Sequence, residues 1–175
     1  MITKFLKLGL ILSMTTLTTT TFAQQHTVSL GYAQSEIENA FDIRGVHAQY
    51  RYELETPLSV MATMSYQTGD ETWIEPGERQ DTDVKHFSLL AGPAYRLNEN
   101  FSVYGVVGIA HSKVESSYRA LNIYENMDLS ETAFAYGVGI NINPAPQYAI
   151  NISYEGTKVD GAKFDGFNIS AGYRF

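Results

Sequence analysis

Catalysis in this chain would rest on histidine and serine, because cysteine is absent and there are four histidines: His26, His47, His86 and His111. A nucleophilic serine needs a histidine base on its own face of the backbone. His111 and Ser112 are adjacent, and adjacent residues of a β-strand point to opposite faces. His86 and Ser88 share a face, but the surrounding alternation predicts that this face, like that of His47, lies inside the protein. We therefore interpret these histidines as interior polar residues, and no metal-binding or cofactor-binding motif stands out.

Charged residues fall on the same predicted interior face at five positions: Arg51, Glu53, Arg96, Glu155 and Arg174. Buried charges are tolerated where opposite charges and hydrogen bonds compensate them. We predict a polar network in which the two glutamates pair with the three arginines. A gated ion path is the alternative function for these residues.

Aromatic residues and cations in the polar connecting segments are the candidate binding residues. Aromatic side chains and arginine are frequent anchors of protein interfaces. The candidates are Trp73, Ile74 and Arg79 in segment 68–83, Tyr118, Arg119 and Tyr124 in segment 115–130, and Lys158 and Lys163 in segment 156–164. The cations Lys158, Lys163 and Arg119 would be available for lipopolysaccharide phosphates. An alternative role for the aromatic residues is anchoring of these segments at the lipid headgroups.

The overall charge is acidic, with 12 Lys and Arg against 19 Asp and Glu. Nucleic-acid binding needs basic patches, so nucleic acid is excluded as a partner. The acidic segments also argue against adhesion to polyanions. The 12 Tyr, 9 Phe and 14 Gly favour an all-β fold.

The elements that carry these residues are eight runs of alternating apolar and polar residues, within 27–33, 45–54, 58–67, 86–97, 101–114, 133–142, 147–155 and 167–175. One face is aliphatic with aromatics near the run ends, and the other carries small polar residues and charges. The run 101–114 is apolar on both faces, which leaves its facing open. A soluble sandwich would bury its aliphatic face against a second sheet. The pattern instead predicts an eight-stranded antiparallel up-and-down transmembrane β-barrel, whose interior its own side chains fill.

The connections alternate between tight turns at 55–57, 98–100 and 143–146 and longer segments at 36–42, 68–83, 115–130 and 156–164. This alternation is typical of an outer-membrane barrel. Residues 1–23 have basic, apolar and small-residue regions in the order of a cleaved signal peptide, so the barrel domain is expected over 24–175. The fourth to sixth runs exceed the length that crosses the hydrocarbon, so part of the sheet is expected to project and offer its edge to another chain.

Five stretches of the chain look like one known family: GYAQSEI (31–37), QYRYELETPLSV (49–60), VYGVVGIAHSKV (103–114), AYGVGININPAPQYAINISYEGTKV (135–159) and ISAGYRF (169–175). They resemble the Ail/Lom/OmpX family of small outer-membrane barrels of Gram-negative bacteria. The resemblance implies a cell-surface protein, with adhesion, invasion or complement resistance as its role. It also implies that Phe175 is an assembly signal for the insertion machinery.

The expected partners are outer-membrane lipid, lipopolysaccharide and host cell-surface, matrix or complement-regulatory proteins, and we expect a monomer without cofactors. The alternatives are a lipid A-modifying enzyme and a structural envelope protein without a specific ligand. The last run, which ends at Phe175, is expected to pair with the first because an open edge is not tolerated in lipid.

Overall fold

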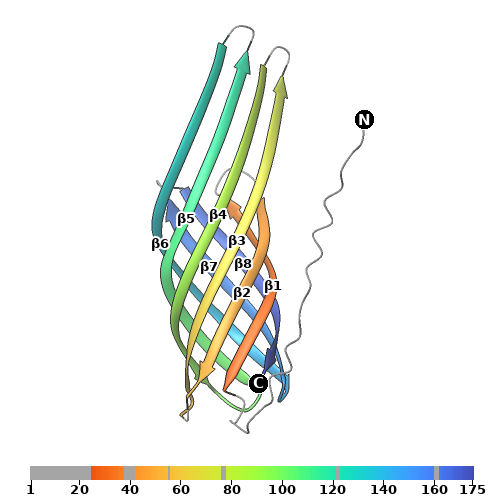
Figure 1. Cartoon of the computed structure of the whole chain (residues 1–175), viewed down its shortest axis with the longest axis vertical. Coiled ribbons are helices and arrows are strands. Elements are labelled where there is room, and N and C mark those ends of the chain that lie inside the picture. The colour runs from red at the N-terminus through yellow and green to blue at the C-terminus, as the bar shows by residue number, and fades with distance from the viewer. Residues whose placement is uncertain (1–24, 38–41, 55, 76–77, 121–122, 160–161) are drawn as a thin grey trace, which may run out of the picture.

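The computed structural model describes residues 25–37, 42–54, 56–75, 78–120, 123–159 and 162–175. They form a closed antiparallel barrel of eight strands in chain order (Figure 1). The strands are β1 (His26–Ile37), β2 (Asp42–Glu53), β3 (Leu58–Glu75), β4 (Glu78–Arg96), β5 (Phe101–Ala120), β6 (Ile123–Ala145), β7 (Tyr148–Val159) and β8 (Ala162–Arg174). Within these ranges no helix is long and apolar enough to cross a membrane. The predicted signal peptide lies outside the described residues.

The barrel closes where β8 pairs with β1, from Thr27 opposite Arg174 to Ile37 opposite Phe164. The closing pair continues one residue further, because the backbones of His26 and Phe175 exchange hydrogen bonds of 3.0 and 2.8 Å. The Phe175 ring also stacks on the His26 ring at a centroid distance of 5.8 Å. The predicted pairing of the last run with the first is confirmed.

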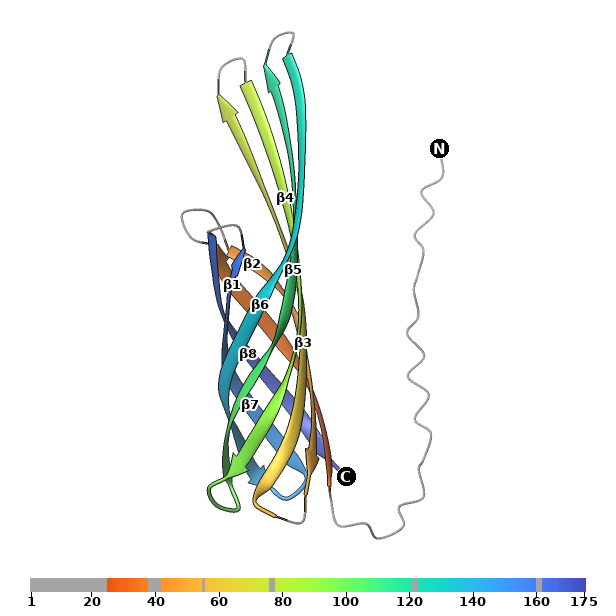
Figure 2. The same ribbon diagram turned by 90° about the vertical axis from the view of Figure 1, so that its left-hand side faces the viewer.

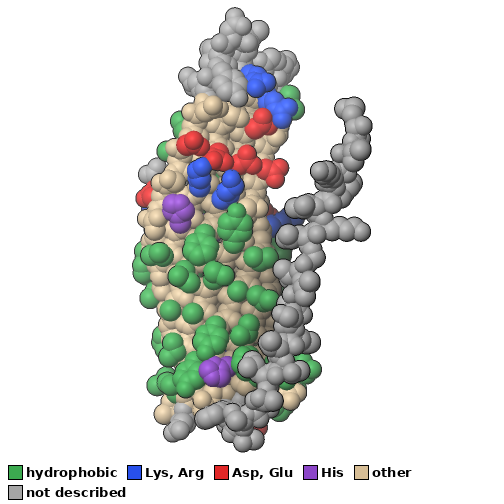
Figure 3. Space-filling model, viewed as in Figure 1, with side chains coloured by type: hydrophobic (Ala, Val, Ile, Leu, Met, Phe, Trp, Pro, Cys, Tyr) green, Lys and Arg blue, Asp and Glu red, His purple; other side chains and the backbone are tan. Residues whose placement is uncertain are grey.

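Side chains alternate between the two faces of the barrel as a strand geometry requires. Most apolar residues of the runs point outward and are exposed, and the serines and asparagines between them, with His47 and His86, are buried. On the face seen in Figure 3, the outward residues form a broad apolar band below the charged side chains. The structure settles the facing of the fifth run: Val103, Val107 and Ile109 point outward, whereas Tyr104 and Val106 point inward.

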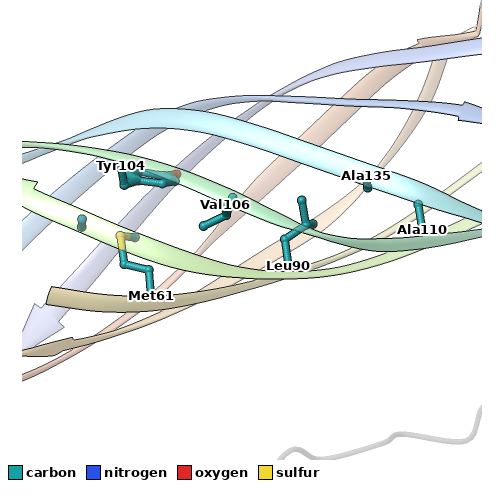
Figure 4. Packing of buried hydrophobic residues seen from close by; sticks show 7 residues of the cluster. Met61, Leu90, Tyr104, Val106, Ala110 and Ala135 are labelled. Atoms are coloured by element: carbon teal, nitrogen blue, oxygen red, sulfur yellow. The ribbon is translucent and has the colours of Figure 1, made fainter.

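The barrel interior is packed with side chains. Met61, Leu90, Tyr104 and Val106 form an apolar cluster with the alanines at 94, 110 and 135 (Figure 4). The Tyr104 hydroxyl accepts a hydrogen bond of 2.8 Å from the Asn151 amide. An eight-stranded barrel has an interior just wide enough for its side chains, and this interior follows that rule.

Four strands, β3 to β6, continue past the others as a projecting sheet (Figure 2). β2 pairs with β3 only as far as Thr68, and β7 pairs with β6 only as far as Ala135, whereas β3 to β6 remain paired with one another up to the last residues before their turns. The predicted projection of the sheet is confirmed.

The tight turns predicted at 55–57 and 98–100 lie between strands as expected, but the predicted lengths of the four longer connections were wrong. Segments 68–83, 115–130 and 156–164 are mostly strand, and each hairpin leaves only two residues outside its strands, at 76–77, 121–122 and 160–161. Segment 36–42 is likewise shorter, since 36–37 belong to β1 and Asp42 begins β2. In segments 68–83 and 115–130 the outward positions carry mainly polar and charged residues, so these segments lack the outward apolar alternation of the barrel runs. Pairing with a neighbouring strand still satisfies their backbone hydrogen bonds.

The predicted turn 143–146 is also shifted. β6 continues to Ala145 with a change of register after Ile142, and the turn itself lies at Pro146 and Gln147. Such an irregularity is a usual way for a strand to end next to proline, which cannot donate to the ladder.

Candidate functional site

Inside the barrel, His86 of β4 contacts a serine. Its Nδ1 lies 2.8 Å from the hydroxyl of Ser112 on β5, directly opposite in register. From the sequence, Ser88 was the serine expected on the same face as His86. In the structure the Ser88 hydroxyl lies 2.7 Å from the Ser65 hydroxyl instead. His111 points outward, away from Ser112, and contacts the Thr132 hydroxyl at 2.9 Å.

An apolar cluster lies beside the His86–Ser112 pair at the end of the barrel from which the projecting sheet continues. Ile37, Ile43, Val84, Val159 and Phe164 form this cluster, and the ring of Phe164 stacks on His86 at a centroid distance of 5.2 Å. His86 and Ser112 are both buried. Among the described residues no carboxylate is hydrogen-bonded to His86, so the pair lacks the orienting group of a catalytic triad.

Three arginines meet at one carboxylate near the opposite end of the barrel. Glu53 of β2 forms ion pairs with Arg51 of the same strand at 3.7 Å, with Arg96 of β4 and with Arg174 of β8. Glu155 was expected in the same network, and this expectation was wrong. It lies inside the barrel next to Ser88 and Asn168, and no ion pair joins it to an arginine within the described part of the chain.

The projecting sheet has two faces of different chemistry, which we call the inner and outer faces. The inner face continues the barrel interior and carries Trp73, Met127 and Leu129, which are 63, 61 and 54% exposed. The outer face continues the lipid-facing surface but is charged. Figure 3 shows its acidic and basic side chains directly above the apolar band.

Four carboxylates lie opposite one another across the outer face. Asp70 pairs with Asp83, Asp83 with Glu115 and Glu115 with Asp128, one residue from each strand. We call these four residues the carboxylate row. Like charges directly opposite on a sheet are destabilising, so this arrangement is not explained by sheet stability.

Two lysines on the membrane side of the row compensate part of its charge. Lys85 lies opposite Lys113, and both bind Glu115, Lys85 at 3.4 Å. These hydrogen bonds, that of Lys113 first, lower the pKa of Glu115 below its usual value. Within the described residues, Asp70 and Asp83 form no ion pair, so the outer face stays net acidic.

The predicted binding residues divide between the two faces. The alternation along their strands places Trp73 and Tyr118 on the inner face and Ile74, Arg79 and Arg119 on the outer face. Tyr124 lies opposite Arg119 in β6, but its side chain is outside the described residues. From the sequence these residues are binding candidates as one group, but in the structure they do not form a single surface.

Arg79 and Arg119 lie directly opposite each other and line a surface cavity of about 270 Å³ with Asp81 and Ser117. Arg79 donates two hydrogen bonds to Asp81, at 2.8 and 3.0 Å. These bonds, with a further one from Thr72, lower the pKa of Asp81. Arg79 therefore already binds a carboxylate.

Lys158 and Lys163 lie apart from the projecting sheet, opposite each other in the β7–β8 hairpin and exposed. The sequence missed Lys85, Lys113 and the carboxylate row. Extending the alternation of the fourth run back to Lys85, and that of the fifth run forward from Lys113 to Glu115, would have placed these three residues on the outward face. No group of three or more His, Asp or Glu in the described ranges could hold a metal ion.

Comparison with known proteins identifies the architecture. The family model "Outer membrane protein beta-barrel domain" matches residues 9–175. The virulence membrane protein PagC of Salmonella typhimurium is 36% identical over 163 residues, which cover 87% of this chain and 88% of that protein. Outer membrane protein X of Enterobacter cloacae is 34% identical over 164 residues, with 89% of each chain covered.

The crystal structure of Ail, the attachment invasion locus protein of Yersinia pestis, superposes with a TM-score of 0.75. Its sequence is 33% identical, and the match covers 88% of this chain and all of that one. The chain is therefore an outer-membrane protein and belongs to the Ail/OmpX family of eight-stranded β-barrels.

Proposed function

We propose that this protein binds macromolecules outside the cell through its projecting sheet, and that adhesion to host surfaces is its role. The observation that carries the proposal is the continuation of β3 to β6 beyond the barrel, with Trp73, Met127 and Leu129 exposed on the inner face and the carboxylate row on the outer face. Such a surface has no role in crossing lipid. Its relatives are named for virulence and for attachment and invasion, which supports the same role.

A protein partner fits this sheet better than a sulfated polysaccharide does. Yersinia pestis Ail has been crystallised with the heparin analogue sucrose octasulfate. In the present chain the outer face carries the carboxylate row, Arg79 is bound to Asp81, and Lys85 and Lys113 are bound to Glu115. A polyanion would have to displace these carboxylates.

Lys158 and Lys163 are proposed to contact lipopolysaccharide phosphates rather than a host protein. They are exposed and opposite each other at the extracellular end of β7 and β8, just above the apolar band. The headgroup region lies at that level, and lysine is a common phosphate ligand. Phe175 is proposed as the assembly signal because its aromatic ring ends the closing strand.

The proposed function is not enzymatic. The His86–Ser112 pair is buried beneath the Phe164 cluster and out of reach of lipid A. Complement resistance would follow if the projecting sheet captures a soluble host regulator, and the experiment below tests it together with adhesion.

The test is to shorten the projecting sheet without changing the barrel. Joining Asp70 to Asp83 and Glu115 to Asp128 with Asn-Gly turns removes 71–82 and 116–127 in register, and keeps Val84 and Val114 at the barrel mouth. In a laboratory strain with few other barrels, the full protein is expected to confer host-cell adherence and serum survival, and the shortened protein to confer neither. A control with a Glu99→Gln substitution in a tight turn should behave as the full protein. Equal adherence by the shortened barrel would refute the proposal.

A further inference from the structure

β6 has a long open edge outside the barrel. On one side its residues pair with β5 continuously from Ile123 to Ile142, whereas its pairing with β7 begins only at Ala135. Thr157 donates a side-chain hydrogen bond of 2.8 Å to the carbonyl oxygen of Phe134, which therefore points toward β7. Backbone groups alternate in direction along a strand, so Asp128 and Ser130 present their N–H and C=O groups to the open edge.

Apart from its acidic side chains, this edge lacks the usual protective devices of an open strand. Open edges are commonly blocked by lysine, proline or a bulge. Residues 123–132 read IYENMDLSET and contain no lysine, arginine, proline or glycine. The register with β5 is unbroken over the same residues. This length exceeds the usual five or six residues of a strand, so a complete added strand would fit.

The acidic residues of the edge decide which chain it would accept. Asp128 ends the carboxylate row on the outer face, and the alternation places Glu131 on the inner face, opposite Ser112. A second copy of the same edge would bring these carboxylates together, and like charges across a sheet are destabilising. The charge therefore disfavours a homodimer and favours a basic partner.

The apolar residues of β6 indicate which side chains the partner strand would carry on its other face. Met127 and Leu129 both lie on the inner face and are mostly exposed. Side chains of an added strand would alternate in the same way, with one set beside Met127 and Leu129 and the next beside Asp128.

We propose that the β6 edge binds an extended, basic strand of a protein partner, in which apolar residues alternate with lysine or arginine. The apolar side chains would pack on Met127 and Leu129, and a cation would pair with Asp128. This inference rests on the proposed function and names the partner's chemistry and its place on the sheet. The edge of β3, at 69–75, is the weaker candidate because it is shorter.

The test uses the full protein in nanodiscs of zwitterionic phosphatidylcholine, which has no net charge to attract basic peptides. The probes are fluorescent nine-residue peptides of alternating valine and lysine, of alternating valine and glutamate, and of the first composition with the valines grouped together. Only the alternating valine–lysine peptide is expected to bind saturably by fluorescence anisotropy. Equal binding of the valine–glutamate or grouped peptide, or no saturable binding of the valine–lysine peptide, would overturn the inference.

A proline substitution locates the site. Ser130→Pro removes an N–H that faces the open edge while leaving the bonds to β5, and should weaken binding by roughly tenfold or more. Ser130→Ala, which keeps the N–H, should bind as the wild type does. Asp128→Asn should weaken binding by roughly threefold and reduce its salt dependence. Unchanged binding by Ser130→Pro, with the barrel shown to be folded by its gel mobility before heating, would rule out this edge.

A second measurement covers the case in which Ser130→Pro fails to fold. Two valine–lysine peptides are used, one methylated on the backbone nitrogens of its valines and the other on those of its lysines. Only every second N–H of an added strand faces β6, so one of the two peptides should lose binding. Equal binding of both would overturn the inference. The cellular assay separates this inference from the proposed function. Adherence that is lost on shortening the sheet but retained by folded Ser130→Pro would overturn only the inference.

Discussion

The carboxylate of Glu53 on β2 binds the guanidinium of Arg174 on β8, a residue 121 positions further along the chain. These two strands flank β1, so the contact spans the seam at which the barrel closes. Arg51 and Arg96 bind the same carboxylate, and burial leaves 5% of the Glu53 side chain exposed. One glutamate thus compensates three arginines from three strands.

Removing that carboxylate should destabilise the barrel strongly. Glu53→Ala removes the carboxylate that three neighbouring cations share, and breaking a buried ion pair costs about 3–5 kcal/mol in free energy of unfolding. Urea unfolding in lipid vesicles, followed by gel mobility, measures the loss. Glu99→Gln, in an exposed turn, is the control and should leave stability unchanged. A loss below about 1 kcal/mol for Glu53→Ala would show that the cluster is compensated by solvent.

Gly31 should be essential where β1 meets β8. A β-carbon at this position would overlap the carbonyl oxygen of Ile169 and the backbone of Ser170. We expect Gly31→Ala to lower the yield of folded, heat-modifiable barrel, since overpacking costs about 1–3 kcal/mol. Gly105→Ala is the matched control, because a β-carbon there meets no atom within 4 Å. Equal yields from both variants would contradict the register of the seam.

The carboxyl group of Asp81 should titrate below the usual range for aspartate. Hydrogen bonds from Arg79 and then Thr72 lower its pKa in the folded protein. A lowered pKa contributes stability that is present above the unfolded value, about pH 4, and is lost as the pH falls through the folded value. NMR titration of the side-chain carboxyl carbon should show this, and Arg79→Gln should move the pKa back toward the usual value. The idea fails if Arg79→Gln leaves the titration of Asp81 where it was.

The purified protein should form no stable pore in planar bilayers. The clusters around Leu90 and around Phe164 fill the barrel at two levels. Conductance should therefore equal that of protein-free membranes from neutral to mildly acidic pH. Large, reproducible conductance steps that scale with protein concentration would mean that the interior opens.

Lipid A should be unchanged by this protein. Mass spectra of lipid A from cells with the wild-type chain, with Ser112→Ala and without the gene are expected to coincide, because Ser112 is buried beside His86. A new acylation pattern that disappears in Ser112→Ala would instead identify the buried pair as catalytic.

The sequence by itself determined the fold and the compartment. Alternation between Val28, Leu30 and Tyr32 and the polar residues between them is a local property, because successive side chains of a strand point to opposite faces. The family resemblance and the closing strand that ends at Phe175 are equally visible in the chain.

Only the tertiary structure decided which distant residues meet. His86 contacts Ser112 rather than Ser88, and Glu155 is separate from the arginines, because partners across strands depend on register and not on spacing. The projecting sheet escaped exact prediction for a similar reason. The outward positions of its strands carry mainly polar and charged residues where water replaces lipid. The sequence there lacks the outward apolar alternation of the barrel runs, so it does not reveal the strand pairing or the carboxylate row from Asp70 to Asp128.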